Sequence, residues 1–161
     1  MGKRINPADL EPLVGTLYPP PFNAPCLARE RRKLGDAAGL TQFGINLVRL
    51  PPGSWSSQRH WHHKSDEFVF ILEGEATLVT DDGPEVLKPG EAAGFKAGER
   101  NGHCLQNRSD ADLVYLEIGT RIADDGGEYS DIDMTFEMTD GITYRRRDGT
   151  PYPKTERRGP R

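Results

Sequence analysis

The sequence predicts an all-β fold, an antiparallel sandwich or barrel, and two observations support this. Strand-like stretches recur about every 8–12 residues between residues 39 and 121, with Gly, Pro and Asp at the turns between them. No stretch of helical periodicity separates these strands. With 161 residues, among them 18 Gly and 13 Pro, the chain suits one loop-rich domain with its own core.

Residues 1–38 are expected to form an irregular arm. The segment LYPPPFNAP cannot be helical, because consecutive prolines fix φ and remove backbone donors. The stretch LARERRKLGDAAG that follows has room for one or two helical turns. In a small β protein such an arm lies across its own barrel or across a partner's, and the sequence leaves both arrangements open.

The predicted barrel spans residues 39–121. LTQFGINLVRL has strand character and ends at Pro51-Pro52-Gly53, a strong turn signal. WSSQRHWHH and EFVFILEG continue the pattern, and EATLVT ends at Asp81-Asp82-Gly83, which is typical of a tight hairpin. PEVLKPGEAAGF, HCLQN and LVYLEIGT supply the remaining strands.

Residues 122–161 form a C-terminal extension with an uneven charge. Seven Asp or Glu and no Lys or Arg lie between Ala123 and Asp140, whereas seven bases follow from Arg145 onward. We interpret these parts as a solvated acidic segment and a loosely ordered basic tail. The stretch MTFEMTDGITYRRRDGTPYP has the pattern of an added hairpin before that tail.

The composition disfavours several classes of protein. The net charge is −4, and the basic residues have little aromatic interleaving, so we expect no nucleic-acid partner. No run of about 18 apolar residues occurs and the first residues lack the apolar part of a secretory signal, so we expect no membrane span and a cytoplasmic protein. Cys26 and Cys104 show no CxxC spacing and are expected to be separate, reduced thiols.

Three of the four histidines lie within four positions, in the stretch RHWHHKSDEFVFILEG. Side chains at i and i+2 of a strand share a face, so His60 and His62 point to one side and His63 to the other. Glu67 follows after a short turn, in a register that brings it to the face of the first two histidines. We therefore interpret His63 and Asp66 as solvated residues of the turn.

The strand that begins at Glu67 is expected to alternate. Its inward residues would be Glu67, Val69 and Ile71, and its outward residues Phe68, Phe70 and Leu72. Two imidazoles and a carboxylate then form three corners of a coordination site. Nitrogen and oxygen donors of this mix suit Zn, Fe, Mn, Ni or Cu rather than Ca or Mg.

The fourth histidine, His103, supports a metal site. It lies in the Gly-rich stretch PGEAAGFKAGERNGHCLQN, where backbone can pass close to a site. Extended geometry puts His103, Leu105 and Asn107 on one face and Cys104 on the other, where Cys104 is expected to be a packed neighbour rather than a nucleophile.

These stretches resemble the two motifs of the cupin superfamily. Residues 53–74 are similar to the first motif and residues 90–107 to the second. The matching positions are Gly53, His60, His62, Glu67, Gly74, Gly90, Gly98, His103 and Asn107. The chain departs from the pattern at Lys96, where a proline is usual, and in the two longer spacings before His60 and His103. The sequence of residues 40–121 resembles that of a bacterial single-domain cupin subgroup, whose members are often labelled sugar-phosphate isomerases.

The resemblance implies a jelly-roll β-barrel that holds one divalent transition metal through His60, His62, Glu67 and His103. The alternative is a binding barrel that has lost its metal. The resemblance also implies a homodimer, and the outward side chains of residues 68, 70 and 72 agree with it. The same side chains could instead pack under the terminal arms of a monomer.

Further residues are candidates for the lining of a small-molecule pocket. Gln58 has inward parity, Phe95 and Tyr115 are aromatic candidates, and Lys96 and Arg100 precede His103 as a cationic clamp for a phosphate. No residue stands out as the catalytic acid or base. We expect an isomerase or lyase acting on a small hydroxy-carbonyl compound, with an Fe(II) dioxygenase or a non-catalytic metabolite-binding barrel as alternatives.

Overall fold

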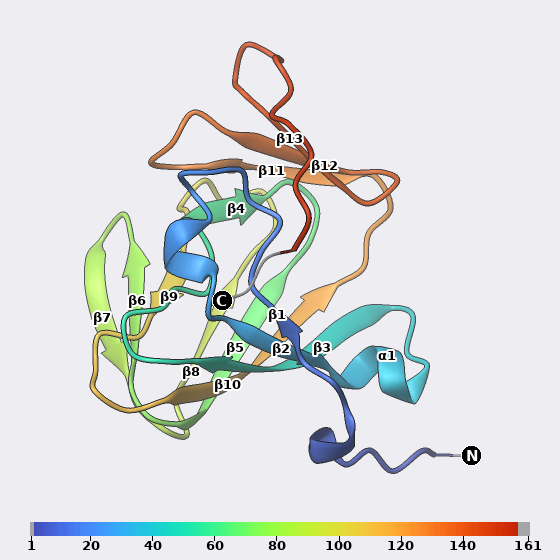
Figure 1. Ribbon diagram of the computed structural model, residues 1–161, viewed down its shortest axis with the longest axis vertical. Coiled ribbons are helices and arrows are strands. Elements are labelled where there is room, and N and C mark those ends of the chain that lie inside the picture. Colours follow the sequence, from blue (N-terminus) through green and yellow to red (C-terminus); the bar gives the residue numbers. More distant parts are fainter. Residues whose placement is uncertain (1, 158–161) are drawn as a thin grey trace.

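The computed structural model describes residues 2–157 and is built mainly of antiparallel strands. Its largest sheet has the strand order β1-β2-β3-β10-β5-β8 (Figure 1). These strands are β1 (Leu13–Val14), β2 (Glu30–Lys33), β3 (Phe43–Leu50), β10 (Leu113–Thr120), β5 (Glu67–Glu73) and β8 (Ala92–Phe95). The all-β prediction is confirmed.

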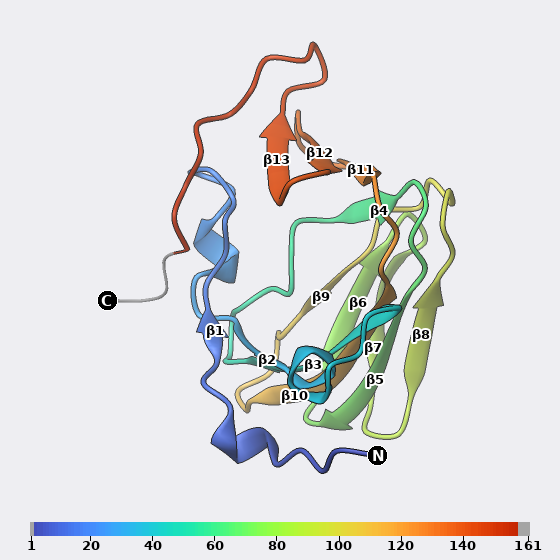
Figure 2. The same cartoon turned by 90° about the vertical axis from the view of Figure 1, so that its right-hand side faces the viewer.

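The opposite wall of the barrel consists of two smaller sheets. One contains β7 (Gly83–Leu87), β6 (Ala76–Thr80) and β9 (Cys104–Gln106). The other contains β13 (Ile142–Arg145), β12 (Thr135–Met138), β11 (Asp125–Tyr129) and β4 (His60–His62), and lies at one end of the barrel (Figure 2). An isolated bridge between His60 and His103 joins the two sheets at the candidate site.

Among residues 2–157, helical structure is confined to short pieces before residue 39. They are η1 (Pro7–Asp9), η2 (Ala24–Cys26) and α1 (Leu34–Ala38). Within residues 2–157, no helix is long and apolar enough to cross a membrane. Cys26 and Cys104 are both buried and unpaired, as the sequence predicts.

The alternation expected for β5 is confirmed. Val69 and Ile71 are buried in the barrel core, whereas Phe68, Phe70 and Leu72 keep 36–41% of their surface exposed. A strand places successive side chains on opposite faces, so the position of Val69 and Ile71 in the core directs Glu67 to the inner face as well. The inward residues of the neighbouring strand β10 are Leu113 and Tyr115, both fully buried, followed by Glu117.

The N-terminal segment contributes to the main sheet instead of remaining irregular throughout. β2 pairs with β3 over four residues, and β1 pairs with β2. The charged stretch in which we expected helical turns therefore divides into strand β2 and the single helix α1. Arg31 lies opposite Val48, a buried residue of β3, so the strand directs one of its charges into the barrel.

The C-terminal extension differs from the sequence prediction in its acidic part. The expected hairpin forms as β12 and β13, but the preceding acidic stretch contains β11, which pairs with both β12 and β4. Asp125 at the start of β11 is only 3% exposed, so the interpretation of this stretch as solvated is wrong at that residue. The last part of the basic tail, residues 158–161, lies outside the described residues.

Two apolar clusters surround the candidate site. The first fills the barrel between the main sheet and the β6–β9 sheet and includes Val48, Ile71 and Tyr115. The second joins the N-terminal segment to β11 and β12, through Tyr18, Cys26, Tyr129, Met134 and Phe136. Because residues of both clusters line one cavity, that cavity lies where the terminal segments meet the barrel.

Candidate metal centre

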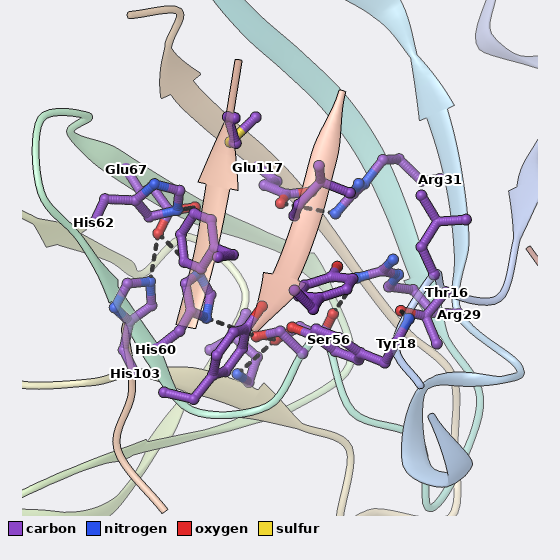
Figure 3. Close-up of a pocket in the computed structure, with 18 of the residues that line it drawn as sticks. Thr16, Tyr18, Arg29, Arg31, Ser56, His60, His62, Glu67, His103 and Glu117 are labelled. Carbon is purple, nitrogen blue, oxygen red and sulfur yellow. Dashed lines mark hydrogen bonds and ion pairs between the residues drawn. The ribbon is translucent and has the colours of Figure 1, made fainter. Parts of the chain in front are cut away.

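Three histidines of the barrel converge on one carboxylate, that of Glu67 (Figure 3). The Nε2 atoms of His60 and His103 lie 3.4 Å and 2.7 Å from Glu67 Oε2, and the Nε2 atom of His62 lies 3.3 Å from Oε1. These groups come from β4, from the bridge residue before β9, and from the first residue of β5. The structure thus brings together the four residues that the sequence singles out as ligands.

The second ring nitrogen of two histidines is already engaged. His60 Nδ1 lies 3.0 Å from the carbonyl oxygen of Gln58, which can only accept, so this nitrogen carries the proton. His62 Nδ1 lies 2.7 Å from Asp125 Oδ2. Both rings therefore present Nε2 to the common centre, as metal-ligating histidines do when their other nitrogen donates to a carbonyl or a carboxylate.

Asp125 is buried and held from both sides. Its Oδ1 accepts a hydrogen bond from the backbone N–H of Lys64, at 2.9 Å, while Oδ2 contacts His62. Although burial alone would raise its pKa, hydrogen bonds from Ser65, His62 and the backbone lower it. Asp125 is therefore an ionised orienting group for His62, a role that the sequence analysis did not assign.

The imidazole of His103 is fixed by stacking. Phe95 lies parallel to it, with ring centroids 3.5 Å apart and an angle of 2° between the planes. The Nδ1 atom of His103 is buried and has no hydrogen-bond partner among the described residues. Burial lowers the pKa of His103 despite the opposing effect of Glu67, which favours the neutral ring that a metal ligand requires.

The charges of the histidines and carboxylates at this centre depend on one another. Burial would lower the pKa of His62, but the carboxylates of Glu67 and Asp125 outweigh it and raise the pKa to about 9. Burial would raise the pKa of Glu67, but the three surrounding histidines keep it well below its ordinary value. The carboxylate is thus ionised and attracts positive charge to this point, which is supplied by protonated imidazole or by a cation.

The donor set fits a divalent transition metal. One donor atom each from His60, His62 and Glu67 lie within 4.8 Å of one another, close enough to bind a single ion. Imidazole nitrogen with one carboxylate oxygen is a combination that suits Zn, Fe, Mn, Ni or Cu. His103 Nε2, in contact with the same carboxylate, supplies a fourth donor.

A cavity of about 590 Å³ opens beside these residues. On the side away from the histidines it is lined by cationic side chains of the terminal segments, namely Arg29, Arg31, Lys33 and Arg157. Figure 3 shows Arg29 and Arg31 across the cavity from the histidines, with Glu117 between. Tyr18, Tyr115, Tyr129 and Tyr144 add phenol groups to its wall.

The arginines are held by backbone and by one acid. Arg29 is 6% exposed and donates to the carbonyl oxygens of Ser56 and, at 3.2 Å, Gly15. Arg157 donates to the same Gly15 oxygen at 3.0 Å. Arg31 pairs with Glu117 at 3.0 Å. Burial and the charges of Arg29 and Arg31 lower the pKa of Arg157, which shows that positive charge is crowded here.

The predicted pocket residues are placed in different ways. Phe95 and Tyr115 both line the 590 Å³ cavity. Gln58 does not, because its side chain turns to the N-terminal segment and donates to the carbonyl oxygen of Phe22 at 2.8 Å. Its carbonyl oxygen, rather than its amide, contributes to the site through His60.

The two cations expected to clamp a phosphate, Lys96 and Arg100, lie outside this larger cavity. Lys96 is exposed and lines a second cavity of about 280 Å³ that also reaches His62, Glu67 and His103. Arg100 lies over the ring of Trp61, at 5.6 Å, and lines neither cavity. The loop before His103 is thus directed away from the larger cavity, and the cations that do enter it come from the terminal segments.

His63 and Asp66 stay outside the metal group. His63 is exposed and lies 3.8 Å from Glu128. Asp66 is exposed as well, but its Oδ1 accepts a hydrogen bond from the backbone N–H of Ala97 at 2.8 Å, which ties the turn before β5 to the end of β8. Cys104 is buried, and burial raises the pKa of its thiol to about 11.

Comparisons with known proteins agree with this architecture. The model of the cupin domain family matches residues 46–119. A solved sugar phosphate isomerase of the cupin superfamily from Silicibacter pomeroyi is 43% identical, with a TM-score of 0.90 over 94% of this chain and 97% of that one. The chain therefore belongs to the cupin superfamily.

More distant structures share the fold. A candidate sugar phosphate isomerase from Acidithiobacillus ferrooxidans is 27% identical, with a TM-score of 0.74 over 88% of this chain and 90% of that one. The polyketide cyclase RemF from Streptomyces resistomycificus is 22% identical, with a TM-score of 0.60 over 74% and 80% of the two chains, and shows the fold alone. No curated protein matches the sequence.

Proposed function

We propose that this cupin is a metal-dependent isomerase of a small phosphorylated hydroxy-carbonyl compound, of the sugar phosphate class. One observation carries the proposal: the His/Glu group and the cations of the terminal segments line the same cavity. A carbonyl and a phosphate are the two functional groups of such a substrate, and they need these two kinds of partner. The similar proteins from Silicibacter pomeroyi and Acidithiobacillus ferrooxidans are described as a sugar phosphate isomerase and a candidate sugar phosphate isomerase.

His60, His62, Glu67 and His103 are the residues that would hold the metal. A divalent ion bound there supplies a Lewis acid that polarises a carbonyl group and stabilises negative charge on its oxygen. Around it, the chain fixes the orientation of two imidazoles through the Gln58 carbonyl and Asp125. Such outer contacts keep the ligands in one arrangement.

The opposite wall suits an anion. Arg29, Arg31 and Arg157 bring three guanidinium groups to the cavity, and Glu117 is the acid that pairs with one of them. A guanidinium group binds phosphate through charge-assisted, often bidentate hydrogen bonds. The strand order separates the metal group from the arginines by a suitable distance. Strand β5, with Glu67, and strand β2, with Arg31, are three strand positions apart, or about 14 Å.

The tyrosines of the cavity suit the hydroxyl groups of a sugar. Burial raises the pKa of Tyr18, Tyr115 and Tyr129 above the ordinary phenol value, so these phenols remain protonated at neutral pH. A protonated phenol can donate a hydrogen bond to a substrate oxygen and accept one from a hydroxyl group.

The test is an NMR assay of aldose and ketose phosphates, with the sugars that lack the phosphate as a parallel series. We expect interconversion of at least one phosphorylated pair and values of kcat/KM at least about 100-fold lower without the phosphate. Arg157→Gln should raise KM about tenfold or more. Arg146→Gln serves as the matched control, because Arg146 lies over the ring of Tyr152 outside the cavity and should leave KM unchanged.

Two results would contradict the proposal. One is the absence of interconversion across the phosphorylated pentoses and hexoses with Zn, Mn, Fe, Ni or Cu supplied. The other is oxygen consumption by the Fe(II)-loaded protein over diketone, thiol and catechol substrates, which would assign the centre to dioxygenase chemistry instead.

A further inference from the structure

One carboxylate besides Glu67 lines the cavity among the described residues, and it is Glu117. An aldose–ketose isomerisation needs a group that removes a proton from carbon and returns it to the neighbouring carbon. Glu73, Glu75 and Glu91 are exposed and line neither cavity that reaches the histidines. Of these two cavities, Asp82, Glu85 and Glu99 line only the smaller one, which lacks the arginines. Glu117 therefore has the access that this role requires.

The sheet register places Glu117 beside the metal group. Glu117 lies opposite Val69, and Glu67 lies opposite Gly119, so the two glutamates are diagonal neighbours on the inner face. Diagonal neighbours of an antiparallel pair are about 7–8 Å apart, close enough for both carboxylates to reach one small molecule. A backbone held in a continuous strand fixes this separation.

The two oxygens of Glu117 have different surroundings. Oε1 accepts a hydrogen bond from Arg31 Nη2 at 3.0 Å. Oε2 is buried and has no partner among the described residues. Figure 3 shows the Glu117 side chain between the histidines and the arginines. One oxygen is thus anchored, and the other is a buried acceptor that no described residue satisfies.

We propose that Glu117 is the proton carrier of this isomerisation, an inference that rests on the proposed function. The carboxylate takes the proton from the carbon next to the carbonyl. The C–H electron pair becomes the C=C bond of an enediolate, and the carbonyl π pair moves to its oxygen. Glu117 then returns the proton to the former carbonyl carbon while a hydroxyl proton passes between the two oxygens, so that aldose and ketose interconvert without an oxidant.

Arg31 is the positioning residue of this pair. It holds Oε1 from β2, two strands away, and so fixes the orientation of the carboxylate in the cavity. The competing explanation is that Glu117 merely neutralises Arg31. These roles differ in the variants they tolerate, because a glutamine can still accept a hydrogen bond from Arg31 but cannot take a proton.

The experiment compares Glu117→Gln, Glu117→Asp and the control Glu73→Gln in the full chain with its metal. Glu73 is an exposed residue of the adjacent strand β5, so its variant repeats the charge change outside the cavity. The readouts are kcat and KM for the sugar phosphate pair that the unmutated protein interconverts. Metal content, and the affinities for inorganic phosphate and for a four-carbon phosphorylated hydroxamate that mimics the enediolate, are measured on the same samples.

A proton carrier predicts that Glu117→Gln lowers kcat by about 100-fold or more and changes KM by less than about threefold. Glu117→Asp should keep more activity than Glu117→Gln, because it retains a carboxylate. Metal content and phosphate affinity should stay unchanged, whereas the hydroxamate should bind at least about tenfold more weakly to Glu117→Gln.

Two outcomes overturn the inference, and they are distinguishable. If the unmutated protein isomerises a sugar phosphate and Glu117→Gln does so with similar kcat, or exceeds Glu117→Asp, Glu117 is a structural partner of Arg31 and the proposed function stands. If the unmutated protein isomerises no member of the panel, the proposed function fails and this inference fails with it.

Discussion

His62 lies between two carboxylates, and this arrangement links the charge of the centre to the stability of the protein. Glu67 contacts Nε2 and Asp125 contacts Nδ1. Without a metal, the two acids raise the pKa of His62 to about 9, although burial opposes the shift. A metal would take the place of the proton on Nε2, so metal and proton compete for this ring.

The metal-free protein should lose stability as the pH rises through this range. A histidine with a raised pKa stabilises the fold fully below its unfolded value of about 6.5, and this contribution is lost as the pH rises through about 9. We expect the EDTA-treated protein to unfold several degrees lower at pH 9.5 than at pH 6.5, measured by circular dichroism.

Asp125→Asn is the matched variant, since it removes one of the two carboxylates and should show a smaller decrease. The comparison is needed because the buried thiols of Cys26 and Cys104 act in the same direction, with pKa values raised by burial to about 12 and about 11. A melting temperature that falls equally in both proteins would show that His62 makes no such contribution.

At the scale of single residues, the sequence predicts the metal ligands better than the residues that orient them. The alternation of a strand is sufficient to put His60 and His62 on one face, and a short turn brings Glu67 to it. Asp125 follows His62 by 63 positions and Glu117 lies ten positions after the second cupin motif, so no spacing connects them to the site. Gln58 has inward parity, but its side-chain amide donates to the carbonyl oxygen of Phe22 instead of entering the cavity. Strand parity does not reveal such a contact.

Strand β11 reaches the metal group because one of its glycines, Gly127, lets it approach β4. Gly127 pairs with His62, and a Cβ at this position would lie 2.2 Å from the carbonyl oxygen of Trp61 and 2.5 Å from the ring of Phe136. Neither atom can move away without shifting a strand or a buried ring. The glycine is required by this close packing, which also brings Asp125 to His62.

Gly127→Ala should therefore destabilise the protein by about 1–3 kcal/mol or more and lower its metal affinity. Differential scanning calorimetry measures the first effect and metal titration the second. Gly94→Ala is the control, because a Cβ there meets only the ring of Phe68 at an ordinary 3.7 Å. Equal melting temperatures for the two variants would contradict the role given to Gly127.

The elements of the barrel were more predictable than those of the two extensions. Strands such as β5 carry an alternating apolar pattern, and hairpin turns such as Asp81-Asp82-Gly83 carry their own signal. β2 is the charged sequence ERRK and β11 is DGGEY, and neither shows strand alternation. These strands form because β3 and β4 offer them unpaired edges, which is a tertiary effect that local sequence does not contain.

Across the whole molecule, the terminal segments complete a cavity that the barrel alone leaves open. Arg29 and Arg31 come from the first 38 residues, and Arg157 from the end of the described chain. The C-terminal segment also contacts the N-terminal one directly, through Arg157 and Gly15. The cupin motifs thus supply the metal group, and the extensions supply the charge opposite to it.

The outer face of the main sheet is apolar, and we propose that two copies of the chain pair through it. Phe43, Phe68, Phe70 and Leu72 are all exposed on its strands. We expect a dimer by light scattering, and a monomer after Phe68→Asp and Phe70→Asp are combined. Val86→Asp on β7, also exposed, should leave the dimer intact. A monomeric unmutated protein would contradict this proposal.

The most direct test of the whole account is the metal content of the protein after expression and purification without added metal. Elemental analysis should find about one transition metal ion per chain, and His60→Ala and His103→Ala should each reduce it at least about tenfold. The control His63→Ala should keep its metal, since His63 lies outside the group. Less than about 0.1 ion per chain in the unmutated protein, or no loss in the two variants, would contradict the metal centre on which the proposed chemistry depends.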